Sequence, residues 1–250
     1  MPLASEKLLG FVMALTRISA FFMVLPVFGW DSIPVPIKVS LTLLLAFFFS
    51  MIMPLAVPVQ QASTLEAILL IVNEGTYGLA LGLVAAILFG AVKFAGRIIE
   101  QEMGLTMAEI LDPLTGEEAQ PLGTLLEMMF IIMFLSANGH HLFLLTLSKS
   151  YESFPAGSIP TISVLTGGIV QAGSTMMMAG LKLAAPLLAA SLLLMVVLAV
   201  LARLVPEMDI LFISLPMRIG LGLLMVIAFL PFISMFVTEF AELMGKLAPV

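Results

Sequence analysis

Apolar residues along this chain fall into long runs that short polar or proline-rich stretches separate. The runs cover residues 8–28, 39–57, 65–94, 122–147, 159–202 and 210–237. Strands rarely exceed ten residues, whereas about 20 apolar residues are enough for a helix to cross the hydrocarbon core of a membrane. The pattern therefore predicts an all-α chain of membrane-type helices, roughly five to seven of them depending on how 159–202 divides.

Proline and glycine positions predict where these helices bend or end. Pro186 lies inside the longest run, and proline lacks a backbone N–H, so a kink or a break is expected there. Four glycines lie between 166 and 180, and glycine weakens helices. We therefore expect a turn between two packed helices in that stretch. The expected architecture is a set of helical hairpins with kinked helices.

Composition supports an integral membrane protein. Hydrophobic residues make up 61% of the chain and charged residues 10%, whereas a soluble domain carries about 25% charged residues. The first apolar run continues too far and contains Arg17, so it is not expected to be a cleavable signal. The net charge of −6 argues against a nucleic-acid partner, and the absence of cysteine excludes disulfides and thiolate metal sites.

One polar stretch, 97–120, stands apart from the apolar runs. It holds six of the 16 acidic residues. Its centre, Asp112-Pro113-Leu114-Thr115-Gly116, combines residue types typical of turns. Met107, Ile110 and Leu111 interleave with the acids. The stretch is therefore either a solvated loop between helices or a loop that rests against an apolar surface.

No catalytic signature is present in the sequence. Metalloprotease, nucleophile-elbow and phosphate-loop motifs are all absent, so no enzyme activity, cofactor or metal is expected. The two histidines, His140 and His141, are adjacent. Neighbouring positions on a helix point about 100° apart, which disfavours a shared metal ion. A structural role is the favoured interpretation, and a proton-sensing role stays open.

Several charged residues lie in or beside the apolar runs. A charge in hydrocarbon is costly, so each is expected to pair or to face water or protein. Two interpretations follow: the charges line a path in a secondary transporter, or they are buried at contacts between helices and between subunits. Their number in so short a chain, and the lack of a clear inverted repeat, favour the second. The charges concerned are Arg17, Glu66, Glu74, Lys93, Lys182 and Arg218.

Four groups of motif residues follow one another along nearly the whole chain. They are Arg17, Pro26, Gly29, Pro34, Pro36 and Lys38, then Met103-Gly104 with Asp112-Pro113-x-x-Gly116, then Asn138-Gly139-His140-His141-Leu142, and finally Arg203-x-x-Pro206-x-Met208 with Ile210, Phe212, Pro216 and Gly220. In this order, the motifs resemble the FliR family of flagellar type III export-gate subunits and its homologues in virulence-type secretion. Glu207 and Asp209 depart from the pattern, because the family often has an amide pair there.

The resemblance implies a single domain over 1–250 that looks like a FliP joined to a FliQ, with a polar central loop at about 97–120. It implies a place in the bacterial inner membrane, within the flagellar basal body, in contact with lipid. Its implied partners are FliP and FliQ, with FlhB and FlhA, and the implied cargo is unfolded flagellar proteins.

The resemblance also implies roles for particular residues. The central loop is expected to plug the pore, through Thr106, Met107, Ile110, Leu111, Asp112, Pro113 and Gly116. Apart from the resemblance, buried charges and assembly contacts are expected at Arg17, Lys38, Lys182, Arg203, Glu207, Asp209 and Arg218.

Overall fold

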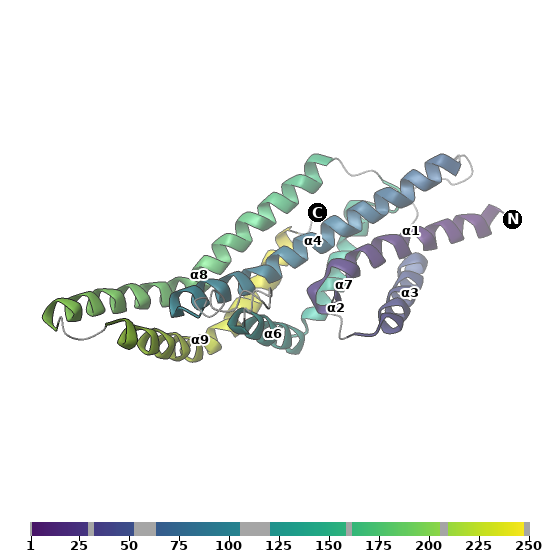
Figure 1. Cartoon of the computed structure of the whole chain (residues 1–250). Coiled ribbons are helices and arrows are strands. Elements are labelled where there is room, and N and C mark those ends of the chain that lie inside the picture. The colour runs from purple at the N-terminus through teal and green to yellow at the C-terminus, as the bar shows by residue number, and fades with distance from the viewer. Residues whose placement is uncertain are drawn as a thin grey trace, which may run out of the picture. The chain divides into compact units, whose positions relative to one another are not determined.

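Helices make up the regular secondary structure of the part of the chain that the computed structural model describes, residues 2–29, 33–52, 64–105, 121–158, 162–205 and 210–247. The all-α prediction is therefore confirmed. The helices, shown in Figure 1, are α1 (Pro2–Val24), α2 (Pro26–Gly29), α3 (Val35–Ile52), α4 (Thr64–Met103), α6 (Pro121–Ser136), α7 (Gly139–Ser153), α8 (Ile162–Leu204) and α9 (Ile210–Leu247).

Four of the described helices are long and apolar enough to cross a membrane: α1, α3, α4 and α8. Helices α6 and α7 together form a bent pair that would make a fifth span. The break between them falls at Ala137 and Asn138, where Asn138 takes a left-handed backbone with φ 61°. Asparagine tolerates that conformation better than most residues. Among the described residues, this gives four or five candidate spans, against the five to seven helices that the sequence predicts for the whole chain.

The turn predicted between 166 and 180 is wrong. Helix α8 runs without interruption through all four glycines and through Pro186. Each glycine costs the helix about 1 kcal/mol relative to alanine. An unpaired backbone group in an apolar environment costs several kcal/mol, so continuous helical hydrogen bonding is favoured over a turn.

The end of α4 also differs from the sequence interpretation. The polar loop was expected to begin near 97, but α4 continues to Met103. It ends in a two-bond C-cap: Gly104 N–H donates to Gln101 O (3.0 Å) and Leu105 N–H donates to Glu100 O (3.1 Å). This pattern requires a left-handed residue after the helix, and Gly104 supplies it with φ 76°.

Two compact units make up the fold, and the long helices α4, α8 and α9 contribute to both. The first unit comprises Met1–Leu88, Asn138–Ser174 and Phe240–Val250. The second comprises Phe89–Ala137 and Thr175–Glu239.

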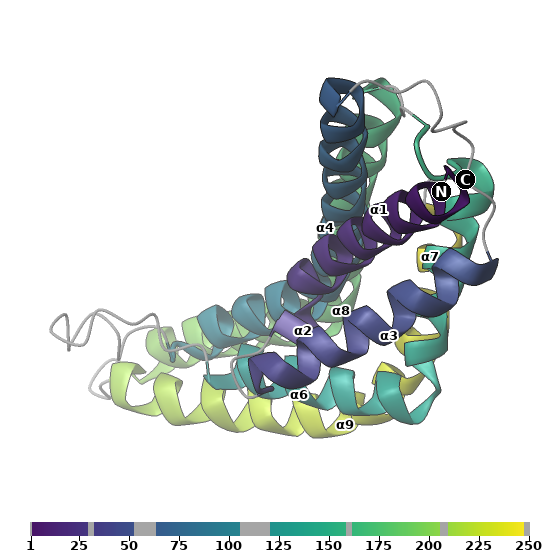
Figure 2. The same cartoon turned by 90° about the vertical axis from the view of Figure 1, so that its right-hand side faces the viewer.

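In the first unit, α1 packs against α3 and against the first half of α4 (Figure 2). Two glycines of α4 allow the close approach. A Cβ on Gly78 would lie 2.3 Å from the carbonyl oxygen of Arg17, and one on Gly82 would lie 2.8 Å from that of Phe21. Because real Cβ atoms do not approach backbone oxygen so closely, α1 and α4 can meet here only where α4 has no side chains.

In the second unit, the second half of α4 contacts α6, α8 and α9. A Cβ on Gly96 would lie 2.4 Å from the Cα of Gly123 in α6, so these two helices cross backbone to backbone. Seven residues before Gly96, the ring of Phe89 makes edge contacts with those of Phe130 and Phe134, at centroid distances of 5.4 and 5.1 Å. These rings form the apolar core of the α4–α6 contact.

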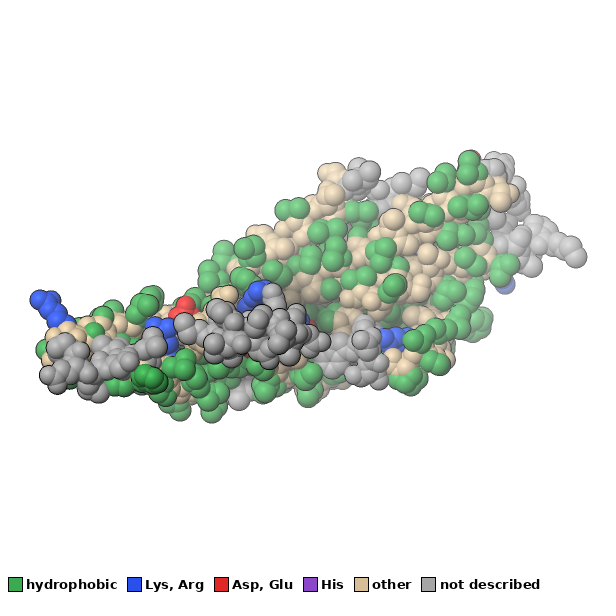
Figure 3. All heavy atoms as spheres, viewed as in Figure 1, with side chains coloured by type: hydrophobic (Ala, Val, Ile, Leu, Met, Phe, Trp, Pro, Cys, Tyr) green, Lys and Arg blue, Asp and Glu red, His purple; other side chains and the backbone are tan. Residues whose placement is uncertain are grey.

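Much of the described surface is apolar. Only Ala46 of α3 is buried, and 17% of the residues in the apolar span of α8 are buried. Figure 3 shows hydrophobic side chains spread over the visible face, with few charged groups among them. A surface of this kind is stable only against lipid or against other protein.

Candidate functional site

The buried charge centre of the first unit is an ion pair between α1 and α4. Arg17 is 1% exposed, and its Nε donates to Glu74 Oε2 at 2.6 Å. Its Nη1 donates to the carbonyl oxygens of Ser150 (3.2 Å) and Phe154 (3.0 Å), at the end of α7. Glu74 Oε1 accepts from Gly157 N–H at 2.8 Å. The pair therefore joins α1, α4 and α7, together with the turn that follows α7.

Two aromatic rings enclose the guanidinium of Arg17. Its Cζ lies 4.7 Å from the ring centroid of Tyr77 and 4.1 Å from that of Tyr151, both within the range of cation–π attraction. These are the only tyrosines in the chain. Both aromatic partners were missed by sequence reasoning. The position of Tyr77, three residues after Glu74 and so on the same helix face, was the available signal.

The arrangement of this centre indicates a structural role. The two charges balance each other. Both carboxylate oxygens of Glu74, and two nitrogens of Arg17, form hydrogen bonds within the chain. Neither group faces solvent. A buried pair satisfied in this way fixes how helices meet, and it leaves no group free for chemistry.

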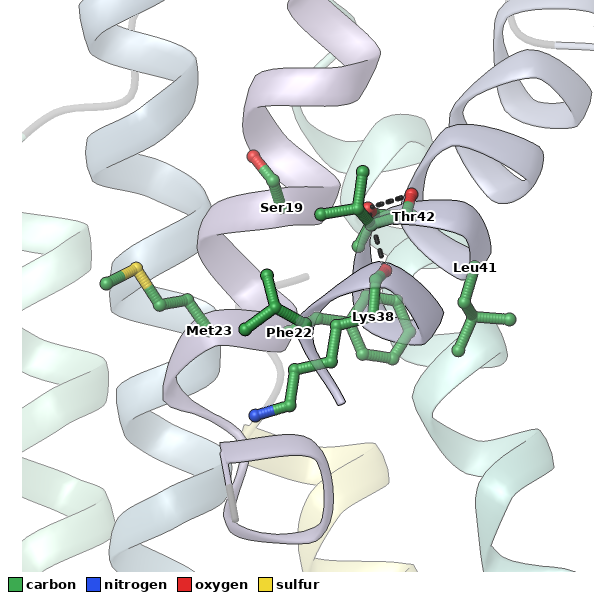
Figure 4. A pocket seen from close by; sticks show the side chains of 8 residues that line it. Ser19, Phe22, Met23, Lys38, Leu41 and Thr42 are labelled. Carbon is green, nitrogen blue, oxygen red and sulfur yellow. Dashed lines mark hydrogen bonds between the residues drawn. The ribbon is translucent and has the colours of Figure 1, made fainter. Parts of the chain in front are cut away.

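Lys38 lies apart from that centre, in a groove of about 450 Å³ between α1 and α3. In Figure 4 the side chains of Lys38 and Met23 line the same end of the groove. Within α3, the hydroxyl of Thr42 donates to Lys38 O (3.0 Å) and Val39 O (2.9 Å). The lining is mostly apolar: Ser19, Phe22, Met23, Val35, Lys38, Val39, Leu41 and Thr42.

The remaining expected assembly residues lie on α8 and α9 or outside the described part of the chain. Lys182 in α8 and Arg203 near its end are exposed, and Arg218 in α9 is half-buried. Glu207 and Asp209 lie outside the described residues. A further ion pair joins α4 to α6, with 3.8 Å between Lys93 Nζ and Glu127 Oε2. Half of the Lys93 side chain is exposed, so this contact adds little stability.

The expected plug residues lie outside the described part of the chain: Thr106, Met107, Ile110, Leu111, Asp112, Pro113 and Gly116.

The structure describes the residues on either side of the expected plug segment. Before them comes the C-cap at Gly104, and after them α6 begins at Pro121. Glu100 Oε1 accepts from the N–H groups of Leu122 and, at 3.0 Å, of Gly123. Sequence reasoning treated Glu100 only as one acid of a polar stretch and missed this contact.

The two histidines lie at the start of α7, and both are exposed. Their ring centroids are 4.3 Å apart at an interplanar angle of 40°. No group of three or more metal-ligating side chains occurs among the described residues. The preceding residues explain the motif locally: Asn138 supplies the left-handed turn, and Gly139 is buried where the chain enters α7.

Comparison with known proteins gives a consistent result over almost the whole chain. Residues 8–244 match the family model described as bacterial export proteins, family 1. The flagellar biosynthetic protein FliR of Escherichia coli K12 is 30% identical over 94% of this chain and 90% of its own length. FliR of Bacillus subtilis is 29% identical, covering 87% and 85%. The Yop proteins translocation protein T of Yersinia pestis is 28% identical, covering 91% and 88%.

Proposed function

Because this chain belongs to the bacterial export proteins of family 1, the FliR family, we propose that it joins FliP and FliQ subunits in a gate that passes unfolded flagellar proteins. Family membership itself makes the chain a non-enzymatic membrane component of the flagellar or related type III export apparatus, in the bacterial inner membrane. The named partners, the gate and its cargo are the proposal, as are contacts to FlhB and FlhA.

One observation carries the proposal: the apolar helices are too long for a bilayer to cover. Helix α8 has 43 residues and α4 has 40. At 1.5 Å per residue their contour lengths are about 65 and 60 Å, against a hydrocarbon core of about 30 Å. The greater part of α8 is not covered by its own chain. Apolar surface that extends beyond what lipid alone covers suits contact with other protein subunits, which favours a multi-subunit gate over a transporter that works alone.

The test is assembly. The tagged chain is expressed alone, with FliP and FliQ, and with each of them singly, and is then purified in mild detergent. We expect a stable, homogeneous particle only from the three-component mixture, because partner helices are needed to cover α3 and α8. A monodisperse chain that is stable alone and binds a small substrate would contradict the proposal and favour the transporter alternative.

Within that gate, we further propose that the central segment plugs the idle channel. The support is the family pattern together with the sequence. An extended polypeptide must pass while ions are held back, and such a barrier is better built from a loop than from packed helices. The turn residues Asp112, Pro113 and Gly116 predict a loop from the sequence. Met107, Ile110 and Leu111, with Thr106 beside them, supply side chains that exclude water from a constriction.

Deletion of residues 107–111 tests the plug. With assembly verified, the gate should become leaky to small ions, measured as conductance in planar bilayers or as growth sensitivity. A deletion variant that stays ion-tight would leave the segment as a simple connector. The finer description of the fold, a FliP-like part followed by a FliQ-like part, also rests on the family pattern and is tested by the structure of the assembled particle.

A further inference from the structure

The groove between α1 and α3 combines a mostly apolar lining with a single charged side chain, that of Lys38. The end of α1, with Ser19, Phe22 and Met23, forms one wall. The first turns of α3, with Lys38 and Thr42, form the other. None of the described residues that line the groove is acidic. An occupant that complements this lining is therefore largely apolar and carries a negative charge at one end.

The position of Lys38 along α3 places its charge at the level of lipid headgroups. Helix α3 has 18 residues, and at 1.5 Å per residue it is about 27 Å long, close to the thickness of about 30 Å of a hydrocarbon core. A single crossing therefore puts the first turn of α3, which contains Lys38, at one edge of the core. Lysine side chains near helix ends extend their ammonium groups into this interface.

The polar groups of the groove leave the binding of an anion to Lys38. The hydroxyl of Ser19 donates to Thr16 O at 3.1 Å, and that of Thr42 donates to carbonyl groups of its own helix. The ammonium of Lys38 carries three donors, so it can bind an anion together with another acceptor. In Figure 4 its side chain extends toward Met23, at the end of α1.

The size of the groove suits a flexible chain better than a helix. Its volume is about 450 Å³, within the range of about 300–1,000 Å³ that is typical of small-molecule sites. An α-helix with its side chains is about 10–12 Å across, so this volume holds only about one turn of it. Phe22 is buried, whereas Met23, Val35 and Val39 are exposed and offer apolar surface to an acyl chain.

We propose that the groove between α1 and α3 binds an anionic phospholipid, with its phosphate on the ammonium of Lys38 and an acyl chain along Met23, Val35 and Val39. Basic pockets between membrane helices bind anionic headgroups in this way. The inference goes beyond the proposed export gate and does not depend on it, because lipid surrounds the chain with or without FliP and FliQ. It gives Lys38 a lipid ligand in place of the subunit contact expected from the sequence.

Photolabelling of the full chain tests the site. The chain, with whichever of FliP and FliQ copurify, is reconstituted into phosphatidylcholine vesicles that contain a small amount of phosphatidylglycerol with a diazirine on one acyl chain. After illumination, mass spectrometry of peptides locates the label and measures its amount. We expect the label at Met23, Val35 and Val39. We expect about fivefold less of it when phosphatidylcholine carries the same diazirine chain, because this headgroup has no net charge.

Four variants separate the charge of Lys38 from the shape of the groove. Lys38→Gln should lower the labelling about fivefold, the factor that corresponds to about 1 kcal/mol for one basic residue near an anionic membrane surface. Lys38→Arg keeps the charge and should keep the labelling. Ser19→Trp should lower it, because the ring takes up space in the groove. Lys182→Gln, which removes an exposed lysine of the apolar helix α8, is the matched control and should leave it unchanged.

Equal labelling by the two lipids, or unchanged labelling in Lys38→Gln or Ser19→Trp, would overturn the inference and leave only general contact between lipid and an apolar surface. Competition by glycerol 3-phosphate in solution would overturn it in favour of a site for free phosphate groups. If Lys38→Gln does not fold, the comparison of the two lipids on the unaltered chain decides the question by itself.

The same experiment distinguishes a lipid from a partner subunit. A groove that is labelled in the chain alone but not when FliP and FliQ are bound would overturn the inference, because a subunit would then occupy the groove in the gate. Labelling that persists in the bound state supports the lipid. Failure of FliP and FliQ to copurify would contradict the proposed gate, whereas the labelling of the chain alone would still decide the lipid site.

Discussion

Arg17, on α1, owes its buried position to partners that come from two other helices, α4 and α7. Its guanidinium contacts Glu74, the carbonyl groups at the end of α7, and the rings of Tyr77 and Tyr151. A single charge in that place would be strongly destabilising, whereas the balanced set is tolerated. Burial of Arg17 is therefore tolerated only when α1, α4 and α7 have come together.

Replacing Arg17 by methionine should destabilise the chain by about 3–5 kcal/mol, because the carboxylate of Glu74 would stay buried without its cation. The measurement is thermal unfolding in detergent, together with the amount of full-length chain in membranes. The double variant Arg17→Met with Glu74→Met should recover part of the loss, since no lone charge remains. Lys182→Met, at an exposed position of α8, is the control. A single variant as stable as this control would contradict the prediction.

The exposed pair His140 and His141 should tolerate substitution. Both rings lie on the surface of the described chain, and the turn beside them is made by Asn138 and Gly139. Replacing both histidines by glutamine should leave export, measured as secreted hook and filament protein, within about twofold of wild type, as surface substitutions usually do little. Loss of export from a normally assembled gate would instead indicate a proton-linked role.

Sequence reasoning identified the charges of this chain but not their pairing. Arg17 and Glu74 are unusual in apolar runs and are visible without a structure. Their contact joins positions 57 residues apart, and the contact with Ser150 spans 133. No local pattern contains that information. The same holds for Glu100, whose partner N–H groups are 22 and 23 residues away.

At the level of helices, glycine has two different effects in this chain. Gly78 of α4 faces the backbone of α1, whereas no heavy atom outside the helix lies within 4 Å of where a Cβ on Gly168 of α8 would be. The sequence alone could not distinguish a glycine at a helix contact from one in open space, and the turn predicted from the glycines of α8 is wrong. Composition identifies a flexible residue, but only packing shows whether the missing side chain is used.

Gly78→Ala should therefore destabilise the first unit by about 1–3 kcal/mol, because the added methyl group forces α1 and α4 apart. Gly168→Ala is the matched control, and it should be neutral or stabilise α8 by up to about 1 kcal/mol, since alanine favours the helix and meets no other atom. Thermal unfolding of the two variants in detergent compares them directly. Equal effects at both positions would show that the close approach of α1 and α4 is unimportant.

At the scale of the whole molecule, the main consequence of the fold is that much apolar helix surface has no contact with other parts of the described chain. The described helices leave most of α3 and α8 exposed. Hydropathy predicted apolar helices correctly, but it could not tell lipid-facing surface from surface that other subunits cover. The resemblance to an export-gate family supplied the expectation of subunit contacts; the family match confirms the family, and the contacts stay a prediction.

Arg218 tests how such surface is used. It lies half-buried in α9. Replacing Arg218 by leucine should lower recovery of FliP and FliQ with the chain several-fold, while the amount of the chain itself stays unchanged, because a subunit contact and not the fold loses its charge. Quantitative copurification measures this. Wild-type recovery of both partners would remove Arg218 from the assembly surface.

Arg17 is far in sequence from its partners in the buried charge centre, and this has a consequence for synthesis in the cell. Helix α1 leaves the ribosome first, and Ser150 follows 133 residues later. At 5–20 residues per second, that interval is about 7–27 s. Throughout it, the guanidinium lacks the carbonyl ligands at the end of α7, and for the first 57 residues it lacks Glu74 as well. During synthesis, Arg17 of α1 must therefore stay in contact with water or with the insertion machinery. Helix α1 can reach its final position in the membrane only after α7 has been synthesised.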